Sequence, residues 1–142
     1  MFDNVWVGDW FGSLEGCPKG KGFVKWAGVL DLTNEMPRLN ASVADDYLNI
    51  PCWDGTPART VEIRKAVDQL QKWMKKGPVL IHCAFGKGRS ATICVALVLA
   101  LGKAKTVEEA VAFVRKGRPQ IKVNKLMRSV LDVYLANLGK DN

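Results

Sequence analysis

Two apolar segments joined by a short glycine-containing loop constrain the fold of this chain more than any other feature. Residues 78–81 are wholly apolar and follow Gly77, a pattern typical of a central strand that is covered on both faces. Residues 89–101 are apolar on nearly every side, which predicts a helix buried in the core. A buried strand that leads into a buried helix needs further layers around it, so the sequence predicts an α/β fold.

Short strands are expected before this unit. Residues 5–7, 28–32 and 47–50 are rich in valine, leucine and aromatic residues and are bounded by turn residues, which predicts strands. Residues 16–22 contain three glycines and a proline, which predicts a surface loop. The elements together predict a small central sheet, mixed but mostly parallel and flanked by helices. The length of 142 residues is that of one domain, spanning 1–142.

Capping residues set the expected boundaries of the remaining helices. Thr56 as N-cap and Pro57 at the first helical position predict a helix over 57–76. Thr106 opens a short helix through a capping box, and Asn124 caps the last helix. The residues expected on the buried faces of the first and last of these helices are Val61, Ile63, Val67, Leu70, Met74, Leu126, Val130, Leu131, Val133 and Leu135.

The loop between the predicted strand and the predicted buried helix carries the residues that suggest chemistry. Cys83 leaves the carboxyl end of a central strand, where α/β folds bind their ligands. Gly86 and Gly88 are free to take positive φ and turn backbone N–H groups inward. The helix that begins near Arg89 points its positive end at the same place. We therefore expect an anion-binding loop the size of a phosphate, whose dipoles lower the pKa of Cys83 and make it nucleophilic.

Three polar side chains beside Cys83 fit the same interpretation. Arg89 can clamp two phosphoryl oxygens in a bidentate fork. Ser90 can donate its hydroxyl to the sulfur, which helps when the thiolate must leave, and His82 is expected to order the loop through backbone hydrogen bonds. The alternative for Cys83 is a buried thiol with only a structural role.

At this point the residues resemble a known family. The pattern Cys-x5-Arg-Ser preceded by His, residues 82–90, resembles the signature of the cysteine-dependent protein tyrosine phosphatase superfamily. Residues 5–8 and 28–33 look like the opening strands of its dual-specificity phosphatases, and 47–51 followed by Asp54 look like their general-acid segment. The resemblance covers nearly the whole chain and is to the small, atypical dual-specificity enzymes.

The resemblance implies a reaction in two steps. The Cys83 thiolate attacks phosphorus to give a cysteinyl-phosphate while an acid protonates the departing oxygen, and water then hydrolyses the intermediate. Asp54 is the implied acid, with Asp45 or Asp46 as the fallback and a capping role as the alternative for Asp54. The phosphate is expected to be held by the loop between the strand and the helix, namely Ala84, Phe85, Gly86, Lys87, Gly88 and Arg89. No metal and no cofactor is required.

The class of substrate stays open at this point. A dual-specificity protein phosphatase acting on phosphotyrosine and on phosphoserine or phosphothreonine is the first interpretation. A phosphoinositide or inositol-phosphate phosphatase is the second, because Lys87 resembles the extra positive charge of that branch; a solvated Lys87 is its alternative. A catalytically inactive phosphate-binding module is the third. Phe85 stands where the family often has a small residue, and either walls the pocket or packs on the sheet.

The net charge and the cysteine content limit the partners and the compartment that we expect. The formal net charge is +7, and residues 103–128 hold eight lysines and arginines against two glutamates. We expect a phosphorylated protein or a phosphoinositide as substrate, a weak contact with an acidic membrane surface, and no nucleic acid, for which no reading motif is visible. The four cysteines form no CxxC pair, which indicates reduced thiols in the cytoplasm. Cys52 is either a disulfide partner of Cys83 under oxidation or a plain buried cysteine.

Overall fold

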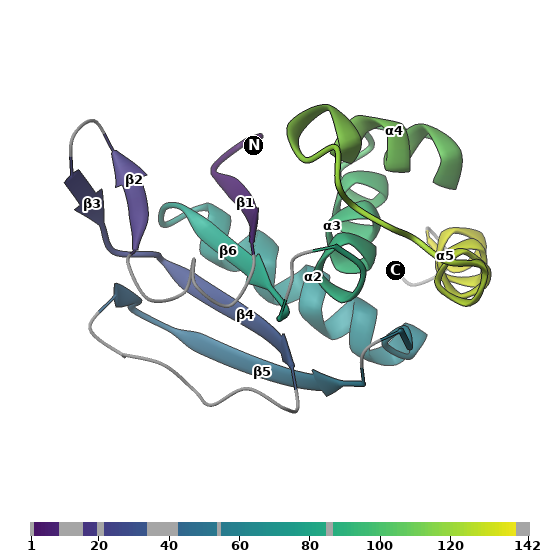
Figure 1. Ribbon diagram of the computed structural model, residues 1–142, viewed down its shortest axis with the longest axis horizontal. Coiled ribbons are helices and arrows are strands. Elements are labelled where there is room, and N and C mark those ends of the chain that lie inside the picture. The colour runs from purple at the N-terminus through teal and green to yellow at the C-terminus, as the bar shows by residue number, and fades with distance from the viewer. Residues whose placement is uncertain are drawn as a thin grey trace.

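A four-stranded parallel sheet lies at the centre of the molecule (Figure 1). The computed structural model describes residues 2–8, 16–19, 22–33, 43–53, 55–84 and 87–138. The strands lie in the order β1 (Val5–Gly8), β6 (Val79–His82), β4 (Gly28–Thr33) and β5 (Tyr47–Cys52), and all three pairings between them are parallel. This confirms the predicted strands and the mostly parallel sheet.

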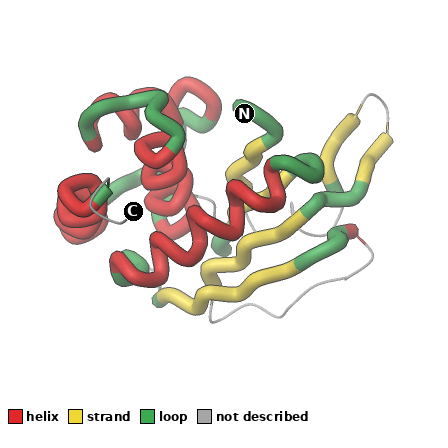
Figure 2. Tube along the Cα trace, turned by 180° about the vertical axis from the view of Figure 1, so that it is seen from behind, coloured by secondary structure: helices red, strands yellow, loops and turns green. Residues whose placement is uncertain are grey.

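Helices cover one face of this sheet and pack on one another beyond it (Figure 2). They are α2 (Thr60–Met74), α3 (Arg89–Ala100), α4 (Val107–Gly117) and α5 (Lys125–Asn137). α3 lies in the middle, and its residues from Arg89 to Leu99 are all buried, as its apolar sequence predicts. None of the helices within the described part of the chain is long and apolar enough to cross a bilayer.

The register brings the carboxyl ends of the strands to one edge. Gly8 of β1 and Asp31 of β4 both lie level with His82, the last residue of β6. Since β5 and β6 run the same way, the described residues that follow them both begin at this edge. The loop after β6 and the segment after β5 are therefore neighbours, although the 26 residues 53–78 separate these two strands in sequence.

Residues 16–22 differ from the surface loop that their composition predicts. Two short strands, β2 (Cys17–Lys19) and β3 (Gly22–Val24), form an antiparallel hairpin there. Cys17 is buried with Trp26, Val29 and Leu80 on the sheet face opposite the helices. The apolar contacts of Cys17 hold the base of the hairpin, and the glycine-rich composition conceals them.

The start of α2 also differs from the prediction. The Thr56 hydroxyl donates to the carbonyl oxygen of Trp53 at 2.6 Å and its backbone N–H donates to the same oxygen at 3.1 Å, which closes a turn. The helix begins at Thr60 instead, and Glu62 accepts the backbone N–H of its N-cap, Arg59. Val61 lies on the outer face of this helix and is 60% exposed, in contrast to the prediction.

The caps of the last two helices are confirmed. Thr106 accepts the N–H of Glu109 at 3.1 Å, and Asn124 accepts the N–H of Met127 at 2.8 Å. The buried face of α5 matches the predicted one in part. Leu131 is buried and Val130 and Leu135 pack on the core as expected, whereas Leu126 and Val133 are about half exposed and Met127 and Tyr134 are buried in addition.

Candidate active site

Cys83 lies between the last residue of β6 and the first turn of α3, as the sequence predicts. It is 3% exposed, and its Sγ lies 3.3 Å from the Oγ of Ser90 in the first turn of α3. The thiol thus faces the positive end of a buried helix and a hydroxyl that can donate to it. Ala84 follows at an intermediate exposure, while Phe85 and Gly86 lie outside the described residues.

Gly88 is required for a reason other than the predicted one. Its φ is −118°, so this glycine does not use the positive φ expected of it. A Cβ here would instead lie 3.3 Å from the carbonyl oxygen of Lys122 and 3.2 Å from Cε of Met127. The segment before α5 therefore packs directly on the loop, and Gly88 allows that close approach.

Arg89 is buried at the start of α3 and is held from the neighbouring strand. It is 3% exposed, and its Nη1 donates to the carbonyl oxygen of Cys52, the last residue of β5, at 2.8 Å. A guanidinium presents a rigid fork of donors, so one bond to a carbonyl fixes the plane of the others. Arg89 also lines the same pocket as Cys83.

That pocket has a volume of about 320 Å³ and opens above the loop. Four of its lining residues come from the predicted loop and helix start, and four come from elsewhere in the chain. The lining residues are Gly55, Cys83, Lys87, Gly88, Arg89, Lys122, Asn124 and Met127. Sequence reasoning missed Gly55, Lys122, Asn124 and Met127 as pocket residues because only the folded chain brings them to the loop. For Asn124 the sequence predicts a helix cap and a match to the family's pattern, but no place in the pocket.

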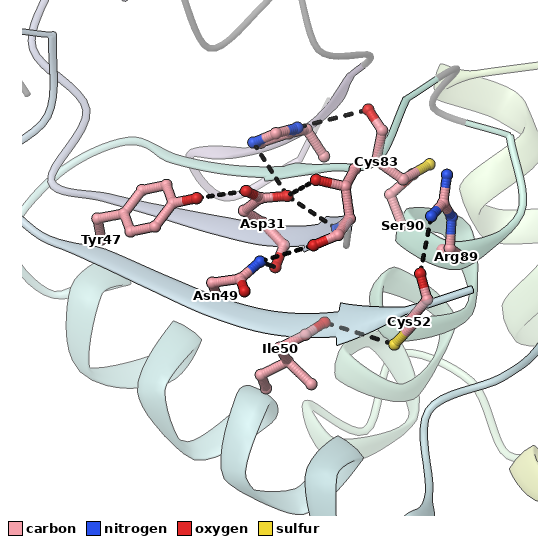
Figure 3. A network of polar contacts seen from close by, with 10 residues as sticks. Asp31, Tyr47, Asn49, Ile50, Cys52, Cys83, Arg89 and Ser90 are labelled. Carbon is pink, nitrogen blue, oxygen red and sulfur yellow. Dashed lines mark hydrogen bonds and ion pairs between the residues drawn. The ribbon is translucent and has the colours of Figure 1, made fainter. Parts of the chain in front are cut away.

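A polar network around Asp31 lies next to the nucleophile (Figure 3), and His82 is buried within it. Its Nδ1 lies 3.4 Å from the carbonyl oxygen of Cys83, and its Nε2 lies 3.8 Å from the Oδ1 of Asp31. Both side chains are nearly fully buried. The predicted supporting role of His82 thus has a matching geometry, with an oxygen facing each ring nitrogen.

The carboxylate of Asp31 is held by further donors in the same network. Its Oδ1 accepts the N–H of Thr33 at 2.8 Å and the Thr33 hydroxyl at 2.7 Å, and its Oδ2 accepts the Tyr47 hydroxyl. Asn49 Nδ2 donates to the carbonyl oxygens of Asp31 and Thr33, both at 2.9 Å. Sequence reasoning missed this network, although an aspartate inside the otherwise apolar strand 28–32 was a readable signal.

The structure describes two of the three candidate general acids. Asp54 lies outside the described residues, between Trp53 and the pocket residue Gly55. Asp45 and Asp46 precede β5, at the end of the sheet opposite Cys83, so neither is placed to serve as the fallback acid. Asp46 instead accepts the indole N–H of Trp73 at 2.9 Å and the N–H of Tyr47, and these bonds hold its pKa below the usual value.

Cys52 presents its backbone, and not its thiol, to the site. Its Sγ donates to the carbonyl oxygen of Ile50 at 3.4 Å, and Figure 3 shows it on the far side of the strand from Arg89. Burial raises the pKa of this thiol to about 11, so little thiolate exists near neutral pH. These observations favour the plain buried cysteine over a disulfide partner of Cys83. Cys94 lies within α3, where burial raises the pKa of its thiol to about 12.

The basic segment 103–128 is partly neutralised by acidic neighbours. Lys103 lies 2.8 Å from a carboxylate oxygen of Asp3, and Arg128 contacts Glu108. Lys122 of this segment lines the pocket. Among the residues that the structure describes, no three histidine, cysteine or acidic side chains are grouped as a metal site would require.

Fold and loop together define a class of protein: a parallel sheet whose central strand leads through a Cys-x5-Arg loop into a buried helix is the architecture of the cysteine-dependent phosphatases. The family model described as "Dual specificity phosphatase, catalytic domain" matches residues 22–135. The chain belongs to the dual specificity phosphatase family.

Two curated relatives agree with this assignment. Dual specificity protein phosphatase 14 of Mus musculus is 30% identical over 118 residues, which cover 80% of this chain and 58% of the relative. Dual specificity protein phosphatase 16 of Homo sapiens is 32% identical over 98 residues, 68% of this chain and 15% of the relative. The chain thus spans less than two thirds of either relative.

Solved structures share the fold. Human DUSP28 superimposes with a TM-score of 0.83 at 17% identity, covering 99% of this chain and 96% of that one. A crystal structure of PTPMT1 gives a TM-score of 0.68 at 20% identity, covering 80% and 78% of the two chains.

Proposed function

We propose that this chain hydrolyses phosphate monoesters through a cysteinyl-phosphate intermediate, as a dual-specificity protein phosphatase whose single catalytic domain spans the chain. One observation carries the proposal: Cys83 and Arg89 line one pocket at the start of a buried helix, and the Oγ of Ser90 lies 3.3 Å from the Sγ of Cys83. Positive dipoles, a charged fork and a nucleophile in one place suit an attack on a phosphate dianion.

The proposed steps balance as follows. The Cys83 thiolate attacks phosphorus and the bond to the ester oxygen breaks, with Asp54 giving its proton to the departing alkoxide. Water then attacks the phosphorus of the cysteinyl-phosphate, Asp54 takes a proton from the water, and the S–P bond breaks so that the thiolate leaves with a hydrogen bond from Ser90. Arg89 and the loop amides stabilise the equatorial oxygens in both steps.

A second candidate substrate is a phosphoinositide. Lys87 and Lys122 both line the pocket, and none of its described lining residues is acidic. The structure of PTPMT1, which has the same fold, was solved in complex with PI(5)P. Extra cationic side chains beside the reacting phosphate suit a headgroup with more than one phosphate.

Hydrolysis of a small aryl phosphate by purified protein in reducing buffer tests the proposal. Cys83→Ser is expected to abolish turnover, because the weakly acidic hydroxyl is a poor nucleophile. Arg89→Lys is expected to lower kcat about 10²–10³-fold, since a point charge cannot replace the bidentate fork. Cys17→Ala, a buried cysteine at the hairpin, serves as the control and is expected to retain activity. A wild-type protein that binds phosphate without turnover would instead support the inactive binding module.

Parallel panels of phosphopeptides and phosphoinositides separate the two substrate classes. Higher kcat/KM on phosphotyrosine and phosphothreonine peptides supports the protein phosphatase, and a tenfold preference for phosphoinositides supports the second candidate.

A further inference from the structure

Two large apolar side chains are exposed on segments that contribute residues to the pocket. Trp53 is 72% exposed and lies two residues before Gly55, a lining residue. Leu126 is 54% exposed and directly precedes Met127, another lining residue. Side chains of this size usually contribute most when buried, so their exposure beside one opening calls for an explanation.

Hydrogen bonds fix the backbone that carries these side chains. Asn124 Nδ2 donates to the carbonyl oxygen of Gly55 at 2.9 Å, which joins the turn after β5 to the start of α5. The N–H and hydroxyl of Thr56 both donate to the Trp53 carbonyl, and Asn124 Oδ1 caps the helix through Met127. Trp53 and Leu126 are thus carried by one connected frame at the rim of the pocket.

Lysines lie on or next to the same hydrogen-bonded segments. Lys87 and Lys122 line the pocket, and the N–H of Lys122 donates to the carbonyl oxygen of Lys87 at 2.6 Å, which holds their two segments together. Lys125 is the first residue of α5 and is exposed beside Leu126. We call Trp53, Lys87, Lys122, Lys125 and Leu126 the mouth surface.

We propose that the mouth surface docks on a membrane that carries anionic lipids, with the pocket turned toward the headgroups. Tryptophan is favoured at the membrane–water boundary, and leucine contributes when it enters the acyl region. Lysines close to an anionic surface each add to the binding. This pairing of apolar tips with lysines matches the bilayer boundary, where an apolar layer lies beneath a layer of negative charge. The docking concerns a surface and does not depend on turnover at Cys83.

Co-sedimentation of the full chain with vesicles tests the proposal. We expect binding to phosphatidylcholine vesicles that contain phosphatidylserine, little binding to phosphatidylcholine alone, and loss of binding at high salt. Lys122→Gln and Lys125→Gln are each expected to weaken binding about fivefold. Trp53→Ser and Leu126→Ser are each expected to weaken it about tenfold, through the lost apolar burial.

Val133→Ser is the matched control, since Val133 lies on the same helix and is 52% exposed. It is expected to leave vesicle binding unchanged. Leu126→Ser is expected to retain hydrolysis of a soluble aryl phosphate, and thermal melts check that every variant is folded. These readouts separate membrane binding from general damage to the protein.

The two proposals fail separately. Vesicle binding by a protein without phosphatase activity would overturn the proposed function and leave the membrane surface standing. Absence of binding to the phosphatidylserine vesicles, equal binding to both vesicle types, or equal loss in Val133→Ser would overturn the membrane surface. Capture of an acidic phosphopeptide through Trp53 and Leu126 without vesicle binding would assign the mouth surface to a protein partner, and would overturn it as well.

Discussion

At the scale of single residues, Asp31 is the clearest case of a side chain whose hydrogen-bond partners cannot be read from the sequence. Its carboxylate stands within 4 Å of the ring of His82 and accepts three hydrogen bonds, from Thr33 and Tyr47. A buried carboxylate is costly unless it is bonded in this way. The sequence marks Asp31 as unusual within an apolar strand, but only the pairing of β4 with β6 shows that it faces His82.

We expect Asp31→Asn to lower kcat about tenfold while KM and the fold change little. The amide keeps the shape of the carboxylate but removes the charge that faces His82, and so weakens the hold of that ring on the Cys83 carbonyl. Steady-state kinetics with thermal melts would check this. Asp31→Glu retains the charge and should recover part of the activity; an unaltered kcat in Asp31→Asn would contradict a positioning role.

At the scale of elements, sequence patterns predict the strands and helices that are determined by their own local sequence. The apolar runs at 78–81 and 89–101 became β6 and α3 because residues that are apolar on all sides have to be buried. The start of α2 was wrong because Thr56 satisfies the Trp53 carbonyl and so does not cap a helix. On α5, Leu131 is buried as predicted, but the predictions for Leu126 and Val133 are wrong because the buried face is set by packing on the other helices, which no local pattern records.

The contact between β4 and α2 gives a prediction about stability. A Cβ added at Gly28, the first residue of β4, would overlap the indole ring of Trp73. Gly28→Ala is therefore expected to lower the free energy of unfolding by about 1–3 kcal/mol through overpacking. Gly77→Ala is the control: a Cβ there meets Ala27 at an ordinary 3.5 Å. Urea melts that gave equal losses for both variants would contradict this packing.

The contact between α2 and the segment before β5 depends on pH. Asp46→Ala leaves the buried indole N–H of Trp73 without its acceptor, which should cost about 1 kcal/mol at pH 7. The pKa of Asp46 is lowered in the folded protein, so its stabilisation is present above the unfolded pKa and is lost as pH falls through the folded pKa. Urea melts at pH 7 and at pH 3 should show a smaller loss at pH 3.

Asp45→Ala is the matched control for that series. Asp45 is exposed and lies 3.8 Å from Lys25, a surface pair of small effect, so its removal should change stability by less than about 0.5 kcal/mol at either pH. A loss in Asp46→Ala that is the same at both pH values would contradict the charge-dependent contact.

At the scale of the whole molecule, the candidate site is assembled from distant parts of the chain. The residues of the loop could be named from sequence because they are contiguous: Cys83, Arg89 and Ser90 fall where the pattern places them. Gly55 and Lys122 could not, because they reach the pocket only through the folding of β5 and the packing of residues 121–124 on Gly88. Local chemistry is readable in the sequence, whereas the walls of a pocket depend on the tertiary fold.

The contacts of Arg89 also become apparent only in the folded protein. Its sequence position indicates a side chain that reaches for phosphate, but its Nη1 also bonds the end of β5. One guanidinium therefore connects the loop to the strand that leads into the segment of Asp54. The side chain proposed to bind phosphate thus also holds the strand that precedes the proposed acid.

Rapid acid quenching during turnover of an aryl phosphate, followed by intact-protein and peptide mass spectrometry, tests the central claim most directly. The account predicts that the protein gains the mass of one phosphoryl group, that the label lies on Cys83, and that Cys83→Ser never acquires it. Turnover with no phosphorylated protein, or a phosphoryl group on any other residue, would contradict it.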